Sequence, residues 1–363
     1  MSAARQPRVI TLPGQQLRHW AKLLLDLHLR LSPPLTSRAR TQSSIRIVCI
    51  SDTHNNKPDL PPGDVLIHAG DLTENGSCDE LQAQLEWLSA QPYYAVIAIA
   101  GNHDVLLDEK FLQKYPERRY GDTRTRVDLD WGRVVYLQDE GITVTFPDQK
   151  QQRQYPREGP DELETRPQAN AEVSNNDSHQ ALRDCLPQDQ SQSPKNPRTL
   201  KVYGSPVTPQ YGISAFQYPS SSADEVWSNR IPDDTDIVVV HGPPRLHLDS
   251  TDPNGLRRSG CAHLNQEIHR IRPRLVVFGH IHVGYGREDI ALDDVRQRYE
   301  MVMNRLGGWG VIMGMAWAVM LDYLKRLLRA QPGEQRVTTF VNAAVVGGGL
   351  KNELRNEAIV VDI

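Results

Sequence analysis

The stretch IAIAGNHDVLL, residues 97–107, joins an apolar run directly to a group of polar residues. The apolar part has no polar break, which is typical of a strand buried on both faces of a sheet. It is followed by four residues with site-type side chains or a flexible backbone: Gly101, Asn102, His103 and Asp104. The stretch therefore predicts a buried strand that ends in a loop carrying amide, imidazole and carboxylate groups.

Similar runs recur along the chain and set the fold class. Helix-like stretches such as 79–90 lie between some of them, which predicts an α/β protein. There is too much β-structure for a small dinucleotide-binding fold, so we expect two stacked β-sheets flanked by helices. The predicted strands are IRIVCI (45–50), DVLIHA (64–69), YAVIAIA (94–100), RVVYL (133–137), ITVTF (142–146), LKVYG (200–204), DIVVVH (236–241), RLVVFG (274–279), TTFVNAAVV (338–346) and AIVVDI (358–363).

Composition places the main domain at 45–363, after a leader at 1–44. The leader contains an amphipathic helix at 15–31, which either packs on the domain, stays loose or lies on a membrane surface. Residues 148–199 are rich in Gln, Pro, Asn, Asp and Ser, and we expect a disordered polar insertion there.

A helical apolar insertion is expected at 290–330. Its core, 306–321, is short for a bilayer span and carries several glycines that would permit close helix packing. A buried helix or a protein–protein face, such as an oligomer contact, is the favoured interpretation. Peripheral membrane contact is the alternative.

Charge and cysteine content narrow the function classes. The 363-residue chain has a formal net charge of -4, which gives no footprint for binding nucleic-acid polymers. Its four cysteines show no CxxC spacing, which favours free thiols in a reducing compartment. The N-terminal apolar runs are interrupted by charges and do not resemble a signal peptide. We therefore expect a cytoplasmic protein, with membrane association left open by the two apolar helices.

Five predicted strands end in residues that bind metals or transfer protons. The loops beyond the carboxyl ends of strands form the ligand crevice of open α/β sheets, so these tips can meet in one place. Each tip alone is a weak signal, but five in order are hard to explain by chance. They are SDTH (Asp52, His54), GD (Asp71), GNHD (Asn102, His103, Asp104), HGPP (His241) and GHIH (His280, His282).

This ordered set, SDTH…GD…GNHD…HGPP…GHIH, resembles the calcineurin-like metallophosphoesterase superfamily. The strings HAGDLT (68–73), YGSPVTP (203–209) and GHIHVGYG (279–286) are most similar to its MPPED branch, which includes cyclic-nucleotide phosphodiesterases. The resemblance implies a four-layer α/β sandwich and a metal-dependent phosphoester hydrolase.

The resemblance also implies two divalent metal ions and their ligands. Asp52, His54 and His282 would hold the first ion, Asn102, His241 and His280 the second, and Asp71 would bridge them. Oxygen and imidazole ligands suit Mn²⁺, Fe or Zn²⁺ without choosing among them. Such a pair lowers the pKa of a bridging water for direct attack on phosphorus.

His103 would face the substrate in this family, where it stabilises phosphoryl oxygens or protonates the leaving oxygen. Asp104 is expected to orient the His103 imidazole. Asn102 would also lie beside the substrate, and Gly204 and Ser205, at the end of a strand, are further candidate substrate contacts.

The leading hypothesis is a phosphodiesterase for small substrates such as cyclic nucleotides. A phosphomonoesterase or a protein Ser/Thr phosphatase is the alternative, although the latter typically has GDxVDRG where this chain has GDLTENGS at 70–77. A metal-binding scaffold without catalysis is a third hypothesis, disfavoured because every expected ligand is present.

Overall fold

The protein was analysed as a computed structural model that describes residues 12–32, 44–146, 198–252, 254, 257–328, 336–347 and 352–363. The predicted disordered insertion at 148–199 lies outside these residues, apart from Arg198 and Thr199, which begin a strand.

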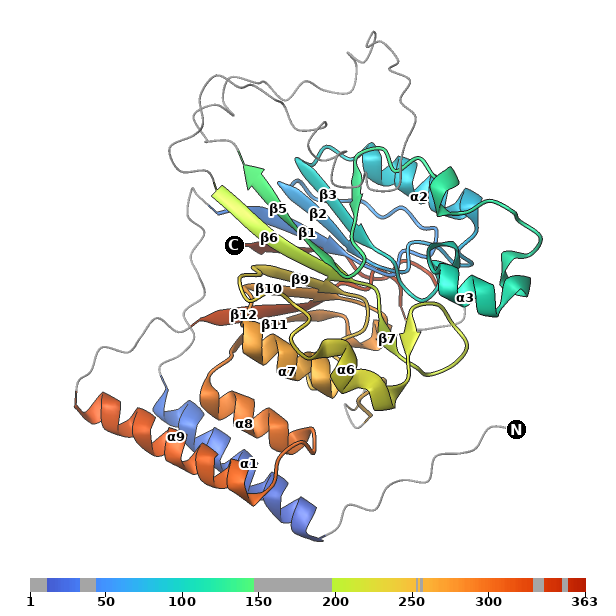
Figure 1. Ribbon diagram of the computed structural model, residues 1–363. Coiled ribbons are helices and arrows are strands. Elements are labelled where there is room, and N and C mark those ends of the chain that lie inside the picture. The colour runs from blue at the N-terminus through green and yellow to red at the C-terminus, as the bar shows by residue number, and fades with distance from the viewer. Residues whose placement is uncertain are drawn as a thin grey trace.

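The first sheet has five strands in the order β13-β1-β2-β3-β4 (Figure 1). Strands β1 to β4 are parallel, and β13 pairs antiparallel with β1 at the edge. Their apolar runs are buried along almost their whole length, as expected for strands covered on both faces. The bounds are β1 Arg46–Ile50, β2 Val65–Ala69, β3 Ala95–Ile99, β4 Val134–Tyr136 and β13 Ile359–Asp362.

The second sheet has six strands in the order β11-β12-β10-β9-β6-β5. Its four inner strands are parallel, and β5 and β11 pair antiparallel at the two edges. A separate two-stranded pair, β7 with β8, lies beyond it. The bounds are β5 Glu140–Phe146, β6 Arg198–Ser205, β7 Thr208–Pro209, β8 Gln217–Tyr218, β9 Ile237–Val240, β10 Leu275–Phe278, β11 Gly286–Ala291 and β12 Val337–Asn342.

The two sheets pack face to face and helices cover their outer faces. Ile67 and Ile97 of the first sheet share a buried cluster with Val239 and Val277 of the second. The helices α2 and α3 cover the first sheet, and α6 and α7 cover the second. The predicted four-layer α/β sandwich is confirmed. These helices span α2 Cys78–Ser89, α3 Glu109–Lys114, α6 Ala223–Trp227 and α7 Ala262–Ile271.

All ten predicted strands are present, and β11 is one that was not predicted. Arg287, Glu288 and Asp289 give β11 a polar pattern without a continuous apolar run. It lies at an edge and pairs only with β12 within the described sheet, so one side needs no apolar cover.

Three helices form an additional layer below α7 (Figure 1). Their inner sides pack together around Ala21, Leu25 and Met315. The predicted helix at 15–31 is present with an earlier start, and 306–321 lies in a helix that is buried on one side only. Within the described ranges, no helix combines the length and hydropathy needed to cross a membrane. The three helices are α1 Leu12–Leu31, α8 Asp294–Met303 and α9 Trp309–Leu327.

Candidate metal centre

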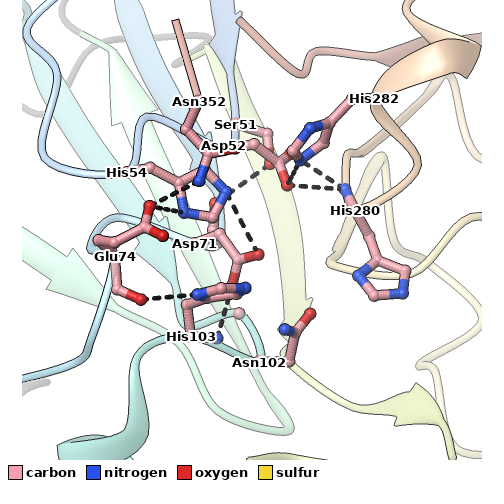
Figure 2. Close-up of polar contacts among 12 residues, drawn as sticks. Ser51, Asp52, His54, Asp71, Glu74, Asn102, His103, His280, His282 and Asn352 are labelled. Atoms are coloured by element: carbon pink, nitrogen blue, oxygen red, sulfur yellow. Dashed lines mark hydrogen bonds and ion pairs between the residues drawn. The ribbon is translucent and has the colours of Figure 1, made fainter. Parts of the chain in front are cut away.

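The tips of β1, β2, β3, β9 and β10 meet at one edge of the sandwich, as their sequence predicts. His241, after β9, reaches across to β2, where its Nδ1 lies 2.9 Å from the Ala69 carbonyl oxygen. Figure 2 shows side chains from these tips pointing toward one another. Three sets of residues at this edge have ligand atoms within 4.8 Å of one another and could hold a metal ion: a first group of Asp52, His54 and His282, a second group of Asp71, His241 and His280, and a third set of His54, Asp71 and His103.

The first group is built around Asp52, which is fully buried. Its carboxylate accepts hydrogen bonds from the His280 backbone N–H at 3.0 and 3.1 Å, and His282 Nε2 lies 3.1 Å from Oδ1. The ring of His54 is also buried, and neither of its nitrogens has a hydrogen-bond partner. Its Nε2 lies 3.8 Å from Asp71 Oδ2, which is too long for a hydrogen bond. Its Nδ1 lies 3.4 Å from the Glu74 carboxylate, so two carboxylates approach the ring and a metal ion at Nε2 would complete its contacts.

The second group brings three electron-pair donors to one point. Because His241 Nδ1 donates to the Ala69 carbonyl, the Nε2 of the neutral ring carries a lone pair. That lone pair faces Asp71 Oδ2 at 3.3 Å and Asn102 Oδ1 at 3.1 Å. The Asn102 amide nitrogen faces Ser214 Oγ at 3.4 Å, which agrees with this orientation of the amide. When the His241 ring is neutral, these three acceptors face one another without a proton between them, and a bound cation would relieve this arrangement; without the cation, a proton on Nε2 takes its place.

The pKa values of the site also indicate that its carboxylates favour a positive charge beside them. Burial opposes protonation of His241, but Asp71 outweighs it and raises the pKa of His241 to about 9. Burial also opposes ionisation of Asp71, yet His241 and its neighbours hold the pKa of Asp71 well below its usual range. Burial lowers the pKa of His280 to about 4. The carboxylates of the site therefore favour a nearby positive charge, and the neutral imidazole of His280 can bind a cation.

The backbone at the site is held in an uncommon conformation. Asp52, His54, Asp71 and His280 all have positive φ angles, between 44° and 64°. Non-glycine residues adopt this left-handed region only at a cost, and such residues cluster at functional sites. Glycine provides room nearby, because a Cβ on Gly279 would overlap the Asp52 carboxylate.

These observations fit a divalent metal. The donor set is imidazole, carboxylate and amide oxygen, without thiolate, and the acidic residues Asp52 and Asp71 are almost completely buried. Burying carboxylates is costly unless they are paired or bind a metal. A metal ion bound here would give the His54 ring a partner. It would also be held by the lone pairs that meet at His241.

His103 lies beside Asp71, at the edge of the first group. Its backbone N–H donates to Asp71 Oδ1 at 2.8 Å, and its ring nitrogen Nδ1 lies 2.7 Å from the Glu74 carbonyl oxygen. Burial lowers the pKa of His103, but Asp71 and the Glu74 carbonyl outweigh this effect, so the pKa lies above its ordinary value. The contact with the Glu74 carbonyl therefore fixes the direction of the His103 ring.

The expected role of Asp104 as the orienter of the His103 imidazole is corrected by the structure. The Asp104 carboxylate accepts hydrogen bonds from the backbone N–H groups of Gly101, Leu72 and Thr73 and from the Thr73 hydroxyl, at 2.7–3.2 Å. Burial and the nearby Asp71 raise the pKa of Asp104 to about 6. Asp104 therefore ties the loop after β2 to the loop after β3, and Glu74 holds the imidazole.

Gly204 and Ser205 are also not where a substrate could touch them. Ser205 is fully buried, and its hydroxyl donates to Asp139 Oδ1 at 2.6 Å. A Cβ on Gly204 would meet Leu137 and Ile99 inside the sandwich. The predicted substrate contacts at these two positions are wrong, because Gly204 faces the space between the sheets and the Ser205 hydroxyl is buried against Asp139.

Sequence reasoning missed Tyr211, which lies at the rim of the site. Its ring centroid is 5.0 Å from that of His280, and its side chain is 60% exposed. The loop is anchored to the site because the Ser214 hydroxyl donates to the Asn102 carbonyl at 2.7 Å. No motif in the sequence pointed to Tyr211, although it follows the strand tip YGSPVTP directly.

Known proteins resemble this chain over the same region. The family model of the calcineurin-like phosphoesterases matches residues 45–284. A probable rhamnogalacturonate lyase C of Emericella nidulans is 37% identical over 325 residues, 89% of this chain and 25% of that protein. Metallophosphoesterase domain-containing protein 1 of Homo sapiens is 34% identical over 278 residues, 71% of this chain and 67% of that protein. A UPF0046 protein of Caenorhabditis elegans is 27% identical over 247 residues, 67% of this chain and 65% of that protein.

The chain thus spans a quarter of the length of the first of these relatives and about two thirds of the other two. The matched region contains every strand tip of the candidate metal centre. With its fold, its convergent ligand groups and this match, the chain belongs to the calcineurin-like phosphoesterase family of metal-dependent phosphoric ester hydrolases.

Proposed function

We propose that the protein hydrolyses small phosphodiesters, with cyclic nucleotides as the leading class, at a dinuclear metal centre bridged by Asp71. The observation that carries this proposal is the position of Asp71 between two ligand groups. Its Oδ2 faces His241 at 3.3 Å on one side and His54 at 3.8 Å on the other. One carboxylate is therefore within reach of both candidate metal positions.

The metal ligands would be Asp52, His54 and His282 for one ion and Asn102, His241 and His280 for the other. This donor set suits Mn²⁺, Fe or Zn²⁺. When bound, two such ions activate a water molecule at neutral pH and stabilise the charge that develops on the phosphoryl group.

His103 would act on the substrate as a general acid. The Glu74 carbonyl fixes one ring nitrogen at 2.7 Å, so the opposite nitrogen has a defined direction. The negative charge of Asp71 favours the protonated ring, which has a proton to donate to a phosphoryl or leaving-group oxygen. The backbone carbonyl and the side-chain amide of Asn102 face Ser214, in the loop that also carries Tyr211 at the rim of the site. Asn102 would therefore lie against the same substrate.

Two features favour a diester over a monoester. Residues 72–77, which follow the bridging carboxylate, read LTENGS and contain no arginine to balance the second negative charge of a monoester. The exposed ring of Tyr211 beside His280 offers a surface on which the organic group of an ester, such as a nucleobase, could stack.

The direct test is hydrolysis of bis(p-nitrophenyl) phosphate and p-nitrophenyl phosphate by the purified chain with added Mn²⁺, followed by 2′,3′- and 3′,5′-cyclic nucleotides. We expect Mn²⁺-stimulated turnover that is faster with the diester. Faster turnover of the monoester would support a phosphomonoesterase or a protein phosphatase. A folded, metal-loaded protein without turnover of either would support the scaffold alternative.

Stacking on Tyr211 is tested by comparing Tyr211→Ala with Tyr211→Phe. We expect KM for an aromatic diester to rise by about three- to ten-fold in the alanine variant, since an aromatic contact contributes about 0.5–1.5 kcal/mol. The phenylalanine variant keeps the ring and should keep KM. An equal rise in KM for both variants would contradict stacking.

A further inference from the structure

The outer side of α9 is an apolar surface that no described part of the chain covers. From Trp309 to Leu324 every exposed residue of this helix is uncharged. Met313 is 73% exposed and Trp317 is 60% exposed, one helical turn apart. Met320 and Leu324 continue the same side at the next turns. Soluble monomers seldom expose a continuous apolar strip of this kind without a binding role.

The opposite side of α9 is already occupied, so the outer side is not an exposed core. Ile312, Met315 and Val319 are buried among residues of α1 and α8. The side chain of Arg298 on α8 lies against the position of Gly314. The inner side of α9 thus completes the packing of the three helices, and its outer side is available to bind a partner.

Helix α1 extends the apolar surface. It lies beside α9, because His28 Nδ1 is 3.6 Å from the Asp322 carboxylate and Arg326 donates to the Leu31 carbonyl. Trp20 and Leu27 are about half exposed, while Leu24 of the same flank packs against the shared cluster. Figure 1 shows both helices at the margin of the molecule, on the far side of α7 and α8 from the sheets.

These two helices carry positive charge on a chain that is negative overall. Helix α1 contains three basic residues and one acidic residue, and α9 contains two and one. The pair therefore has a net charge of +3 with its histidines neutral, whereas the whole chain has a net charge of -4. Lys22 of α1 and Lys325 of α9 are exposed.

We propose that α1 and α9 dock the protein on the surface of a membrane rich in anionic phospholipid. Tryptophan and tyrosine side chains favour the boundary between headgroups and acyl chains, and this surface contains Trp20, Trp309, Trp317 and Tyr323. Its basic residues would contact the anionic headgroups, and Met313 and Leu324 would enter the acyl boundary. Aromatic and aliphatic groups flanked by the exposed Lys22 and Lys325 match an anionic lipid surface better than an uncharged protein face.

The test is co-sedimentation of the full chain with vesicles of phosphatidylcholine alone and of phosphatidylcholine mixed with phosphatidylserine. We expect binding to the mixed vesicles, and at least a ten-fold weaker affinity for the neutral ones. Replacing Met313→Ser together with Trp317→Ser should weaken binding to the mixed vesicles by about ten-fold or more. Replacing Lys22→Gln together with Lys325→Gln should weaken it by about five-fold per charge.

The matched control is Tyr120→Ser together with Val127→Ser, which removes two highly exposed apolar side chains from the segment between α3 and β4. Figure 1 shows α3 and α2 on the opposite side of the sheets from α1 and α9. This control should leave vesicle binding unchanged, and phosphodiester hydrolysis without vesicles should be unchanged in all these variants. A wild-type chain that stays in solution with both kinds of vesicle would overturn the proposal. A wild-type dimer that Trp317→Ser separates, with no vesicle binding, would assign the surface to a second copy instead.

Discussion

Two buried clusters of histidine and carboxylate groups in this molecule have opposite chemistry. At the strand tips, His241 Nε2 faces two acceptors, Asp71 Oδ2 and Asn102 Oδ1, and a metal ion can take the place of its proton. Between α7 and α8, the Glu300 carboxylate instead accepts from three donors. These are His247 Nε2 at 3.1 Å, Asn265 Nδ2 at 2.9 Å and His269 Nε2 at 2.8 Å.

The difference shows how a site can be told from a structural network. Both clusters are nearly free of solvent, so burial and residue type do not separate them. The second cluster matches its acceptor with donors and joins α8 to the second sheet, and the His247 ring stacks on Phe340 at 4.0 Å. In the first, burial lowers the pKa of His54 and of His280, which leaves the lone pairs of these imidazoles for a metal ion beside Asp52 and Asp71. We therefore expect changes in the first cluster to affect activity and changes in the second to affect stability.

The largest effect is expected for Asp71→Asn. Loss of the shared carboxylate weakens both metal positions, and each metal contribution to catalysis is worth several kcal/mol, so diester turnover should fall by about 10⁴-fold or more. The metal-free variant should also unfold at a lower temperature than the metal-free wild type, because the protonated His241 loses its buried counter-charge. Enzyme kinetics and thermal denaturation would check both statements. Retained turnover would place Asp71 outside the centre.

His103→Ala should lower turnover by about 10²–10⁴-fold, the usual range for a general acid. Its metal content should match that of the wild type, because its Nδ1 is held by the Glu74 carbonyl and not by the ligand groups. Metal analysis of the purified variant beside its kinetics would decide. Loss of one metal would show that His103 is a ligand instead. Such a role is within reach, because a ligand atom of His103 lies within 4.8 Å of those of His54 and Asp71.

Glu300→Gln is the counterpart in the structural cluster. Removing the charge leaves buried donors without their acceptor, and breaking a buried pair of this kind costs about 3–5 kcal/mol of unfolding free energy. Urea denaturation would measure the loss, and turnover per folded molecule should stay within about two-fold of the wild type. Glu288→Gln, at a more exposed partner of His247, should cost less. If Glu300→Gln removed turnover without loss of stability, the contrast between the clusters would fail.

The smallest effect is a pH dependence of stability that comes from His247. Burial lowers the pKa of His247, but Glu300 and Glu288 outweigh it and raise the pKa to about 9, above its ordinary value of 6.5. A raised pKa in the folded state contributes stability that is complete below about pH 6.5 and is lost as the pH rises through about 9. Over this range the loss should be about 3 kcal/mol. Urea titrations across the range should show a weaker dependence in His247→Gln, and an equal dependence would contradict the assignment.

Much of the architecture could be predicted because buried parallel strands leave a clear pattern. Continuous apolar runs predicted ten strands, and their polar tips predicted which side chains would meet. The edge strand β11 escaped because Arg287 and Asp289 interrupt its apolar residues, which an edge position allows. The amphipathic pattern of 15–31 predicted the helix α1. It did not predict that α8 and α9 cover its apolar side, because such a pattern does not specify the partner helix.

The details of the site were less predictable, because they depend on loop conformation. Asp104 is adjacent to His103 in the chain, yet its carboxylate turns toward Thr73, and the main chain of Glu74 supplies the contact to the imidazole. Ser205 ends a strand near the site, but its buried hydroxyl donates to Asp139. Tyr211 reaches His280 from a separate segment, so neither periodicity nor a motif could place it.

The most direct test of the central claim is the metal stoichiometry of the purified protein, measured by elemental analysis after loading with Mn²⁺ or Zn²⁺ and removal of unbound metal. We expect two ions per wild-type chain, a marked loss in Asp71→Asn, and two ions in Glu300→Gln. One ion or none in the folded wild type, or two ions retained by Asp71→Asn, would contradict a dinuclear centre bridged by Asp71.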